Sequence, residues 1–407
     1  MNYMERFLPQ SFQKALFATA CFLALSNPYG ARAEDEAPLG IPGLLATESQ
    51  PTQFDLNDVS FLFPIPESSD DLPYLLNVDS PGRGGFLMPA DTRELIASRS
   101  DIPGLYVVAA RVDHCFPGDE PGSCQRQLRI TGQPLRVNPQ TGEITADDRS
   151  IHLFYQLTNW NFKRLVAELR ELKKLSSGET VGKPLSVHPV MQAEGLSGPY
   201  AQKLNSIISA FAGEENFIHV ARITQAGPGR VFIQEDVDSF PVPIPGTLSD
   251  PAPLSLFMSG NPGFGSLLSD RLQDASVEDL WRHQTGSPSA QLNQAELEHA
   301  VNRSFFFDNP LLSDVKTLDC FSCHFAERVR RDLVADPELA LSETAFADEY
   351  LNAKHDLTAT HNGLPIHSEK MFGYTGRAAS VAVRVVNESA VVADALSKRR
   401  FQPERLR

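Results

Sequence analysis

The order of two hydrophobic periods between residues 104 and 238 constrains the fold more than any other feature of the sequence. Apolar runs of strand length and strand composition lie at 104–114, 125–132, 149–157, 216–225 and 229–238. Two amphipathic helical stretches separate the third run from the fourth. Because strands and helices do not alternate strictly, the pattern predicts an α+β domain over 101–239 rather than a parallel βαβ sheet.

The two helical stretches carry recognisable start and stop signals. The first, 159–178, has one apolar stripe and Gly178 as its stop. The stripe consists of Phe162, Leu165, Val166, Leu169 and Leu172. The second is opened by Ser197 and Pro199 and closed by Gly213. Both stretches are therefore expected to pack one face against the sheet.

Two of the five cysteines end the turn-rich loop Cys-Phe-Pro-Gly-Asp-Glu-Pro-Gly-Ser-Cys, between the first two strand runs. We expect a hairpin whose loop is closed by a Cys115–Cys124 disulfide, which would stabilise the fold by about 2.5–3 kcal/mol. Metal binding by this pair is the alternative, but no nearby residues have ligand spacing. His152, His188 and His219 lie in or beside the same elements and are expected to be hydrogen-bonded scaffold residues.

The N-terminus has the order of a secretory signal. Arg6 and Lys14 precede a short apolar run, and Ala-Arg-Ala precedes an acidic stretch, so cleavage is expected after Ala33. Lipidation at Cys21 is the alternative. No later segment has 18 consecutive apolar residues, so no transmembrane segment is predicted. An exported, periplasmic protein keeps its cysteines paired or covalently occupied.

The rest of the chain divides by composition. Residues 34–100 are rich in Pro, Asp and Ser and are interpreted as an irregular lead-in, whereas the proline-dense stretch 240–265 is interpreted as a linker. After it, 266–407 is predicted to form a small, all-helical domain. Within that domain, Asn293 and Glu296 have the spacing of a capping box.

This C-terminal part contains Cys320-Phe321-Ser322-Cys323-His324. With five cysteines and ten histidines in 407 residues, the pattern has little chance of arising by accident. A zinc site would need two more ligands, for which His355, His361 and His367 are the candidates. A redox dithiol would need a strand before the motif, and the preceding segment reads as a helix end and a loop.

C-x-x-C-H is also the attachment signature of haem c, and in bacteria haem c is attached outside the cytoplasm. The motif resembles that of c-type cytochromes at all three defining positions. The resemblance covers roughly residues 290–400. The resemblance implies one covalent haem, with thioethers at Cys320 and Cys323 and His324 as the proximal iron ligand. The stretch that leads into the motif, residues 304–324, is similar to the corresponding stretch of bacterial dihaem cytochrome c peroxidases. That family carries two such motifs and this chain has one, so its mechanism is not transferred.

The sixth iron ligand stays open between three possibilities. Met371, 47 residues after His324, is the methionine that follows the motif. His361 or His367 could take its place, or the position could be empty and reactive. Arg377 and Arg384 could neutralise haem propionates or pair with surface carboxylates.

A net charge of −15 excludes nucleic acid as an expected partner and favours a redox partner with a basic patch. The first hypothesis is an exported electron-transfer cytochrome. The alternatives are a peroxidase-like haem oxidoreductase with an open or displaceable sixth position, and a non-catalytic envelope binding protein with structural haem. Electron transfer is favoured over enzymatic activity.

Overall fold

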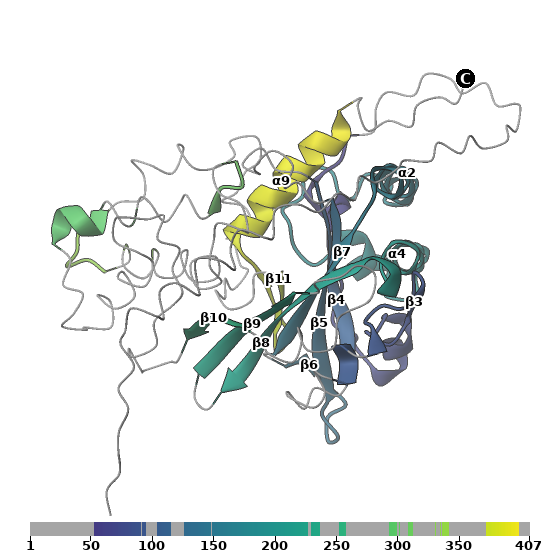
Figure 1. Ribbon diagram of the computed structural model, residues 1–407, viewed down its shortest axis with the longest axis horizontal. Coiled ribbons are helices and arrows are strands. Elements are labelled where there is room, and N and C mark those ends of the chain that lie inside the picture. Colours follow the sequence, from purple (N-terminus) through teal and green to yellow (C-terminus); the bar gives the residue numbers. More distant parts are fainter. Residues whose placement is uncertain are drawn as a thin grey trace, which may run out of the picture. The chain divides into compact units, whose positions relative to one another are not determined.

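A computed structural model shows a large antiparallel sheet with helices on one of its faces and the C-terminal elements packed beside it (Figure 1). The structure describes residues 53–90, 92–94, 104–114, 126–147, 149–226, 229–236, 252–257, 293–298, 301, 308–311, 330, 334, 336–341 and 372–398. The mixed composition of helix and strand agrees with the α+β prediction.

Eight strands form the main sheet, in the order β1-β4-β5-β7-β8-β9-β10, with β6 paired to β5 at the side. Their bounds are β1 Ser60–Leu62, β4 Leu105–Asp113, β5 Gln127–Val137, β6 Ile144–Ala146, β7 Ser150–Gln156, β8 Phe217–Ala226, β9 Gly229–Asp236 and β10 Ala252–Phe257. Every neighbouring pair is antiparallel. The predicted hairpins β4–β5 and β8–β9 are confirmed, and β10 falls inside the stretch interpreted as a linker.

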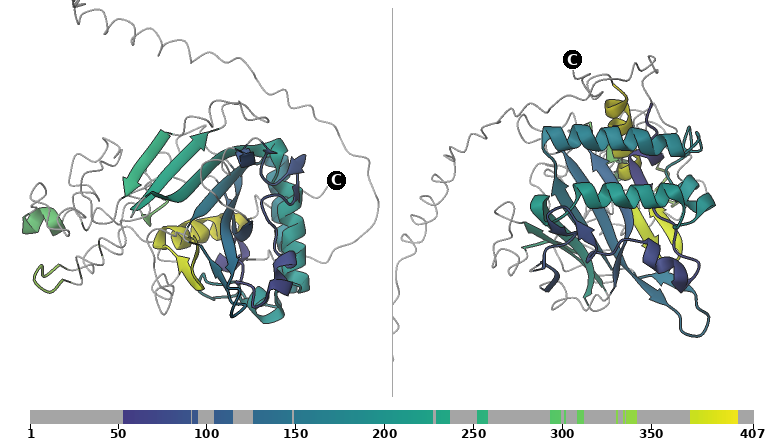
Figure 2. Two further views of the ribbon diagram at one scale, coloured as in Figure 1. Left: turned by 90° about the horizontal axis from the view of Figure 1, so that it is seen from below. Right: turned by 90° about the vertical axis from the view of Figure 1, so that its right-hand side faces the viewer.

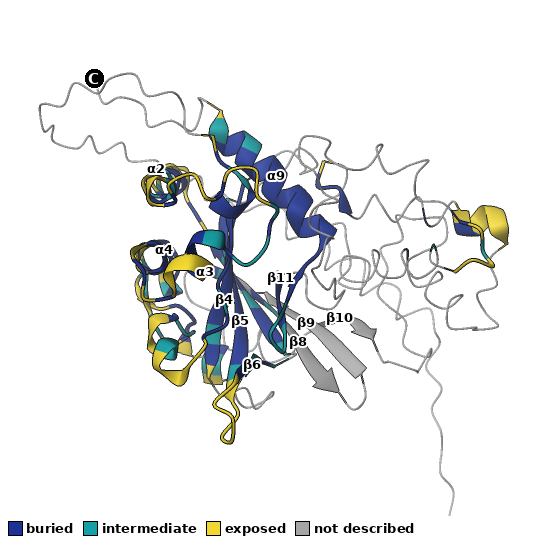
Figure 3. Cartoon of the chain, turned by 180° about the vertical axis from the view of Figure 1, so that it is seen from behind, coloured by how far each residue is buried: buried dark blue, intermediate teal, exposed yellow. Residues whose placement is uncertain are grey.

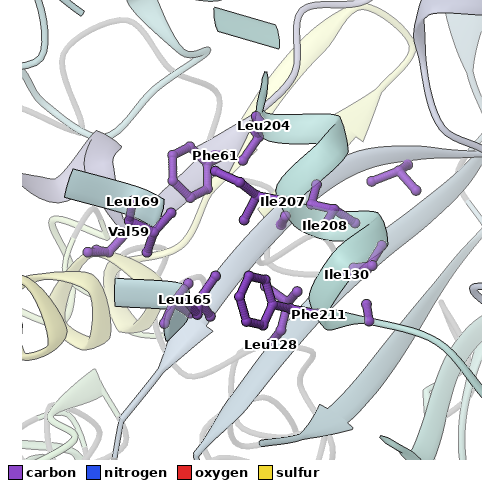
Figure 4. Packing of buried hydrophobic residues seen from close by; sticks show 14 of the residues in the cluster. Val59, Phe61, Leu128, Ile130, Leu165, Leu169, Leu204, Ile207, Ile208 and Phe211 are labelled. Atoms are coloured by element: carbon purple, nitrogen blue, oxygen red, sulfur yellow. The ribbon is translucent and has the colours of Figure 1, made fainter. Parts of the chain in front are cut away.

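Three helices accompany this sheet: α2 Asn159–Leu175, α3 Pro189–Glu194 and α4 Pro199–Phe211. Helices α2 and α4 run side by side across one face of the sheet (Figure 2). All five residues of the predicted α2 stripe are buried. They interdigitate with α4 side chains and with strand residues such as Phe61, Leu128 and Ile130 (Figure 4). The main core is thus the layer between sheet and helices.

The helix ends follow local chemistry. The Thr158 side chain accepts a hydrogen bond from the Asn161 N–H, which caps α2. After α2, Ser177 and Gly178 adopt positive φ, as the predicted stop requires. The prediction that Ser197 opens α4 is wrong by one residue. Gly198 is the N-cap, and Pro199 takes the first helical position, where a missing N–H costs nothing.

Residues 53–90, interpreted from sequence as part of an irregular lead-in, are an integral part of the sheet domain. They contain β1, the short 3-10 helices η1 (Leu56–Asp58) and η2 (Ser69–Tyr74), and the small hairpin of β2 (Pro81–Gly82) and β3 (Gly85–Phe86). Strand β1 pairs with β4. Buried Asp58 fixes η1 by accepting hydrogen bonds from Lys173 and Thr180. The irregular composition of residues 53–90 therefore gave no sign that they supply β1, the strand at one edge of the sheet.

The predicted all-helical domain over 266–407 is not shown. Instead, residues 372–381 form a hairpin, β11 (Phe372–Thr375) with β12 (Ala378–Val381), which leads directly into helix α9 (Val383–Ser397). Gln133 of β5 holds the hairpin by exchanging hydrogen bonds with the Tyr374 backbone, at 2.7 and 2.9 Å. Figure 3 shows α9 buried on nearly all sides. The chain therefore returns to the sheet domain after residue 371.

Two smaller observations complete the description. The predicted capping box is confirmed, because the Asn293 and Glu296 side chains each accept the other residue's backbone N–H. Among the described residues, no helix combines the length and the apolar character needed to cross a bilayer.

Candidate functional site

The sheet face opposite α2 carries charged side chains at alternate positions. Arg111 of β4 and Arg129 of β5 are direct cross-strand partners. Like charges in such a pair repel, unless a carboxylate lies between them. Asp113, only 1% exposed at its side chain, contacts both guanidinium groups. Phe154 of β7 adds its ring, 5.0 Å from the Arg129 guanidinium carbon.

Helix α9 supplies the second carboxylate of this buried charge cluster. Glu388 contacts Arg111 and lies 2.6 Å from Nε of Arg384, one turn earlier on the same helix. The side chains of Glu388 and Arg384 are 2% and 1% exposed. One β1 contact supports the arrangement, a 2.6 Å hydrogen bond between the hydroxyls of Ser60 and Ser389. Charge pairing thus fixes the rotation of α9 about its own axis.

The electrostatics of the cluster are those of a permanently ionised group. Burial alone would raise the pKa of the Glu388 carboxyl. The charges of Arg111 and Arg384 outweigh that effect and lower the pKa to about 2. Glu388 therefore stays charged at all physiological pH values. Such a group is suited to holding structure rather than to exchanging protons.

The residue before Glu388 on α9 connects this cluster to a residue that lies close to the cysteine motif in the sequence. Asn387 donates from Nδ2 to the backbone oxygen of Asp308, at 2.7 Å. The Asp308 carboxylate accepts a hydrogen bond from Arg330 at 2.8 Å, and both side chains are at most 4% exposed. Asp308 precedes Cys320 by 12 residues, and Arg330 follows His324 by 6. The segment that contains the motif thus starts and ends at one buried ion pair.

The chain neighbour of Met371 is anchored at the same end of α9. Phe372 is 2% exposed and pairs with Val381, the last residue of β12. Antiparallel partners lie about 5 Å apart at Cα, and α9 begins two residues after Val381. Described residues that flank His324 and Met371 in the sequence are therefore each held near the N-terminal half of α9.

The predicted site residues themselves lie outside the described residues. These are Cys320, Cys323, His324 and Met371, together with the alternative ligands His355, His361 and His367. The same holds for Cys115 and Cys124. The hairpin that they were predicted to close is confirmed up to the pair Asp113 and Gln127. Within the described part of the chain, no group of three or more His, Cys, Asp or Glu side chains could hold a metal ion.

His188 has a structural role, as expected of a scaffold histidine. It caps α3 by accepting from the Met191 N–H and stacks between Phe61 and Tyr200, with ring centroids 5.9 and 4.5 Å away. Burial lowers the pKa of His188 to about 3, against a smaller opposing effect of the Asn57 backbone. His152 contacts the Thr131 hydroxyl at 3.3 Å. The side chain of His219 lies outside the described residues.

Of the two arginines considered for haem propionates, both are engaged with carboxylates. Arg377 donates to Glu67 and to the Ile144 backbone oxygen, at 2.8 and 2.9 Å. It lines a cavity of about 240 Å³ beside α3, together with Tyr374 and Met191. Arg384 belongs to the buried charge cluster. Pairing with a surface carboxylate, the alternative role, is therefore observed for Arg377, whereas the carboxylate partner of Arg384 is buried.

Sequence reasoning missed the charge cluster, although a signal was present. In Arg111-Val112-Asp113 and in the segment from Gln127 to Gln133, polar residues alternate with buried apolar ones. Such alternation usually marks a solvated sheet face. Here α9 covers that face, and carboxylates from two elements, Asp113 of β4 and Glu388 of α9, partner the arginines there.

No family model, curated protein or solved structure matches this chain.

Proposed function

We propose that this chain is an exported c-type cytochrome that binds one haem covalently and transfers electrons between redox partners. The observation that carries the proposal is the Cys320–His324 spacing, together with the order of charged and apolar residues from which an export signal is predicted. Two thiols three residues apart, followed directly by an imidazole, form the donor set that haem attachment and iron ligation require. When bound, haem c would supply one-electron chemistry at iron.

The arrangement around α9 supports this assignment. The residues that flank His324 and the residue next to Met371 are fixed to the N-terminal half of one buried helix. His324 and Met371, 47 residues apart, could hold one iron only if the fold brings their segments together, and α9 would supply that common anchor. We therefore propose Met371 as the sixth ligand, in preference to His361, His367 or an open position.

In this proposal the sheet domain has a definite part. The haem-bearing segment falls between β10 and β11 in the sequence, so the elements before and after it belong to one folded unit. A rigid frame of this kind would limit movement of the protein groups that would hold the haem. The acidic chain would meet a partner with a basic patch, and their association rate should fall as salt rises.

The proposal is tested by expressing the full chain with a working haem c maturation system. A pyridine haemochrome assay should find one covalent haem per polypeptide, and Cys320→Ser with Cys323→Ser should abolish it. The matched control is Cys115→Ser with Cys124→Ser, which removes the other cysteine pair and should leave the haem in place. Absence of covalent haem from the wild-type protein would refute the proposal.

Optical spectra then identify the sixth ligand. A methionine–iron charge-transfer band in the oxidised protein, lost in Met371→Ala, is the expected result. A high-spin oxidised spectrum that changes on adding cyanide or peroxide would instead favour the peroxidase-like oxidoreductase. Retention of the band in Met371→Ala would exclude Met371 as the ligand.

A further inference from the structure

We infer that Asp308, Arg330 and Asn387 form a clamp that positions the haem-bearing segment on α9. This inference rests on the proposed haem function and adds to it the residues that set the iron environment. None of the three belongs to the attachment motif. Their role follows from where they are bonded and from how deeply they are buried.

The first element of the clamp is the ion pair between Asp308 and Arg330. It joins two points of the chain that are 22 positions apart and that enclose the motif. Its side chains are 3% and 4% exposed, so water does not compete for the charges. Breaking the pair would leave a buried charge without its partner. The two ends of the haem-bearing segment are consequently held together in the folded protein.

The second element connects this pair to the frame. The Asn387 amide donates to the Asp308 backbone oxygen at 2.7 Å and is itself fully buried. On its N-terminal side Asn387 follows Val385 and Val386, which pack in the core beneath the hairpin β11–β12. On its C-terminal side comes Glu388 with its bonds to Arg111 and Arg384. Asn387 therefore has little freedom to shift.

The clamp explains why an almost entirely buried helix should carry an asparagine at this position. A buried amide is retained at a cost unless its hydrogen bonds are made, and an apolar residue would pack in α9 more simply. The Asn387 bond goes to the backbone of the segment that leads to the motif, not to another part of α9. It fixes where the haem-bearing segment leaves the frame.

The test compares Asn387→Ala with Asn216→Ala in the holoprotein. Asn216 is the matched control, because it is a buried asparagine whose Nδ2 donates to the Gln156 and Phe211 backbone oxygens, within the sheet domain. Both variants should unfold at lower temperature. Only Asn387→Ala should also lower the reduction potential and weaken the methionine–iron band, because a displaced segment admits water to the iron.

Arg330→Lys is the second variant. It keeps the positive charge but loses the planar guanidinium group, so the reduction potential of this variant should shift in the same direction as that of Asn387→Ala, by a smaller amount. If Asn387→Ala fails to accumulate, the reduction potential and the methionine–iron band of Arg330→Lys test the clamp instead. If the potentials and bands of Asn387→Ala and Arg330→Lys equal those of the wild type, the clamp is overturned and the cytochrome proposal stands. If wild-type protein carries no covalent haem, both fall.

Discussion

Replacing Glu388 by Gln tests the buried charge cluster with a defined magnitude. The substitution keeps the shape of the side chain but removes the charge that faces Arg111 and Arg384. The Glu388 carboxyl has a pKa of about 2 in the folded protein against an ordinary value of 4.5. This difference corresponds to about 3 kcal/mol of stability at neutral pH. Breaking a buried ion pair typically costs about 3–5 kcal/mol, in agreement.

The pH dependence gives the prediction its sign. Because the folded pKa is the lower one, the stabilisation is fully present above about pH 4.5 and is lost as pH falls towards 2. Urea unfolding of wild type and Glu388→Gln should therefore differ by about 3 kcal/mol at pH 7, and by about 2 kcal/mol at pH 3.5. A difference below about 1 kcal/mol at pH 7 would refute the reasoning, as would one that does not change with pH.

Three further predictions concern other parts of the fold. His188 has a folded pKa of about 3, below its ordinary 6.5, so its stabilising effect is greatest above pH 6.5 and fades as pH falls. Between pH 7 and pH 5, the free energy of urea unfolding should fall by about 2 kcal/mol more for the wild type than for His188→Asn. Parallel dependences of this free energy on pH would contradict the prediction. Gly213→Ala should lower the melting temperature measured by circular dichroism, because its Cβ would lie 2.2 Å from the Arg83 backbone. A Cβ at Gly142 meets nothing within 4 Å, so Gly142→Ala should change the melting temperature little beyond the strain of its φ of +73°. Reduction of the Cys115–Cys124 pair should cost about 2.5–3 kcal/mol in denaturant unfolding, and free thiols in the untreated oxidised protein would count against that disulfide.

Local patterns in the sequence were sufficient to predict most of the sheet domain. The α2 stripe, the hairpins β4–β5 and β8–β9, and the Asn293–Glu296 capping box all depend on residues close together in the chain. Such features follow from period and capping chemistry alone. Their confirmation is a consequence of short sequence separation.

The features that the sequence did not reveal depend on contacts across long separations. Strand β11 is four residues long and contains Gly373, so it has no usable strand signal. Its place is fixed by Gln133 and by the Tyr374 hydroxyl, which donates to the Phe63 backbone oxygen at 2.5 Å. Helix α9 begins at Val383, four residues before Asn387. The β-branched run before Asn387 has weak helix propensity, and burial overrides it.

The buried cluster also affects how the chain must fold if it carries haem. Arg111 and Arg129 sit side by side on a hairpin that can form early, because its strands are close in sequence. Asp113 alone offsets their repulsion until Glu388 arrives from the other end of the chain. Docking of α9 is therefore favoured by charge as well as by apolar burial, and it brings Asn387 to the site where Asp308 is bound. In this order, the sheet domain selects the position of α9, and Asn387 of α9 then binds Asp308, which precedes the cysteine motif in the sequence.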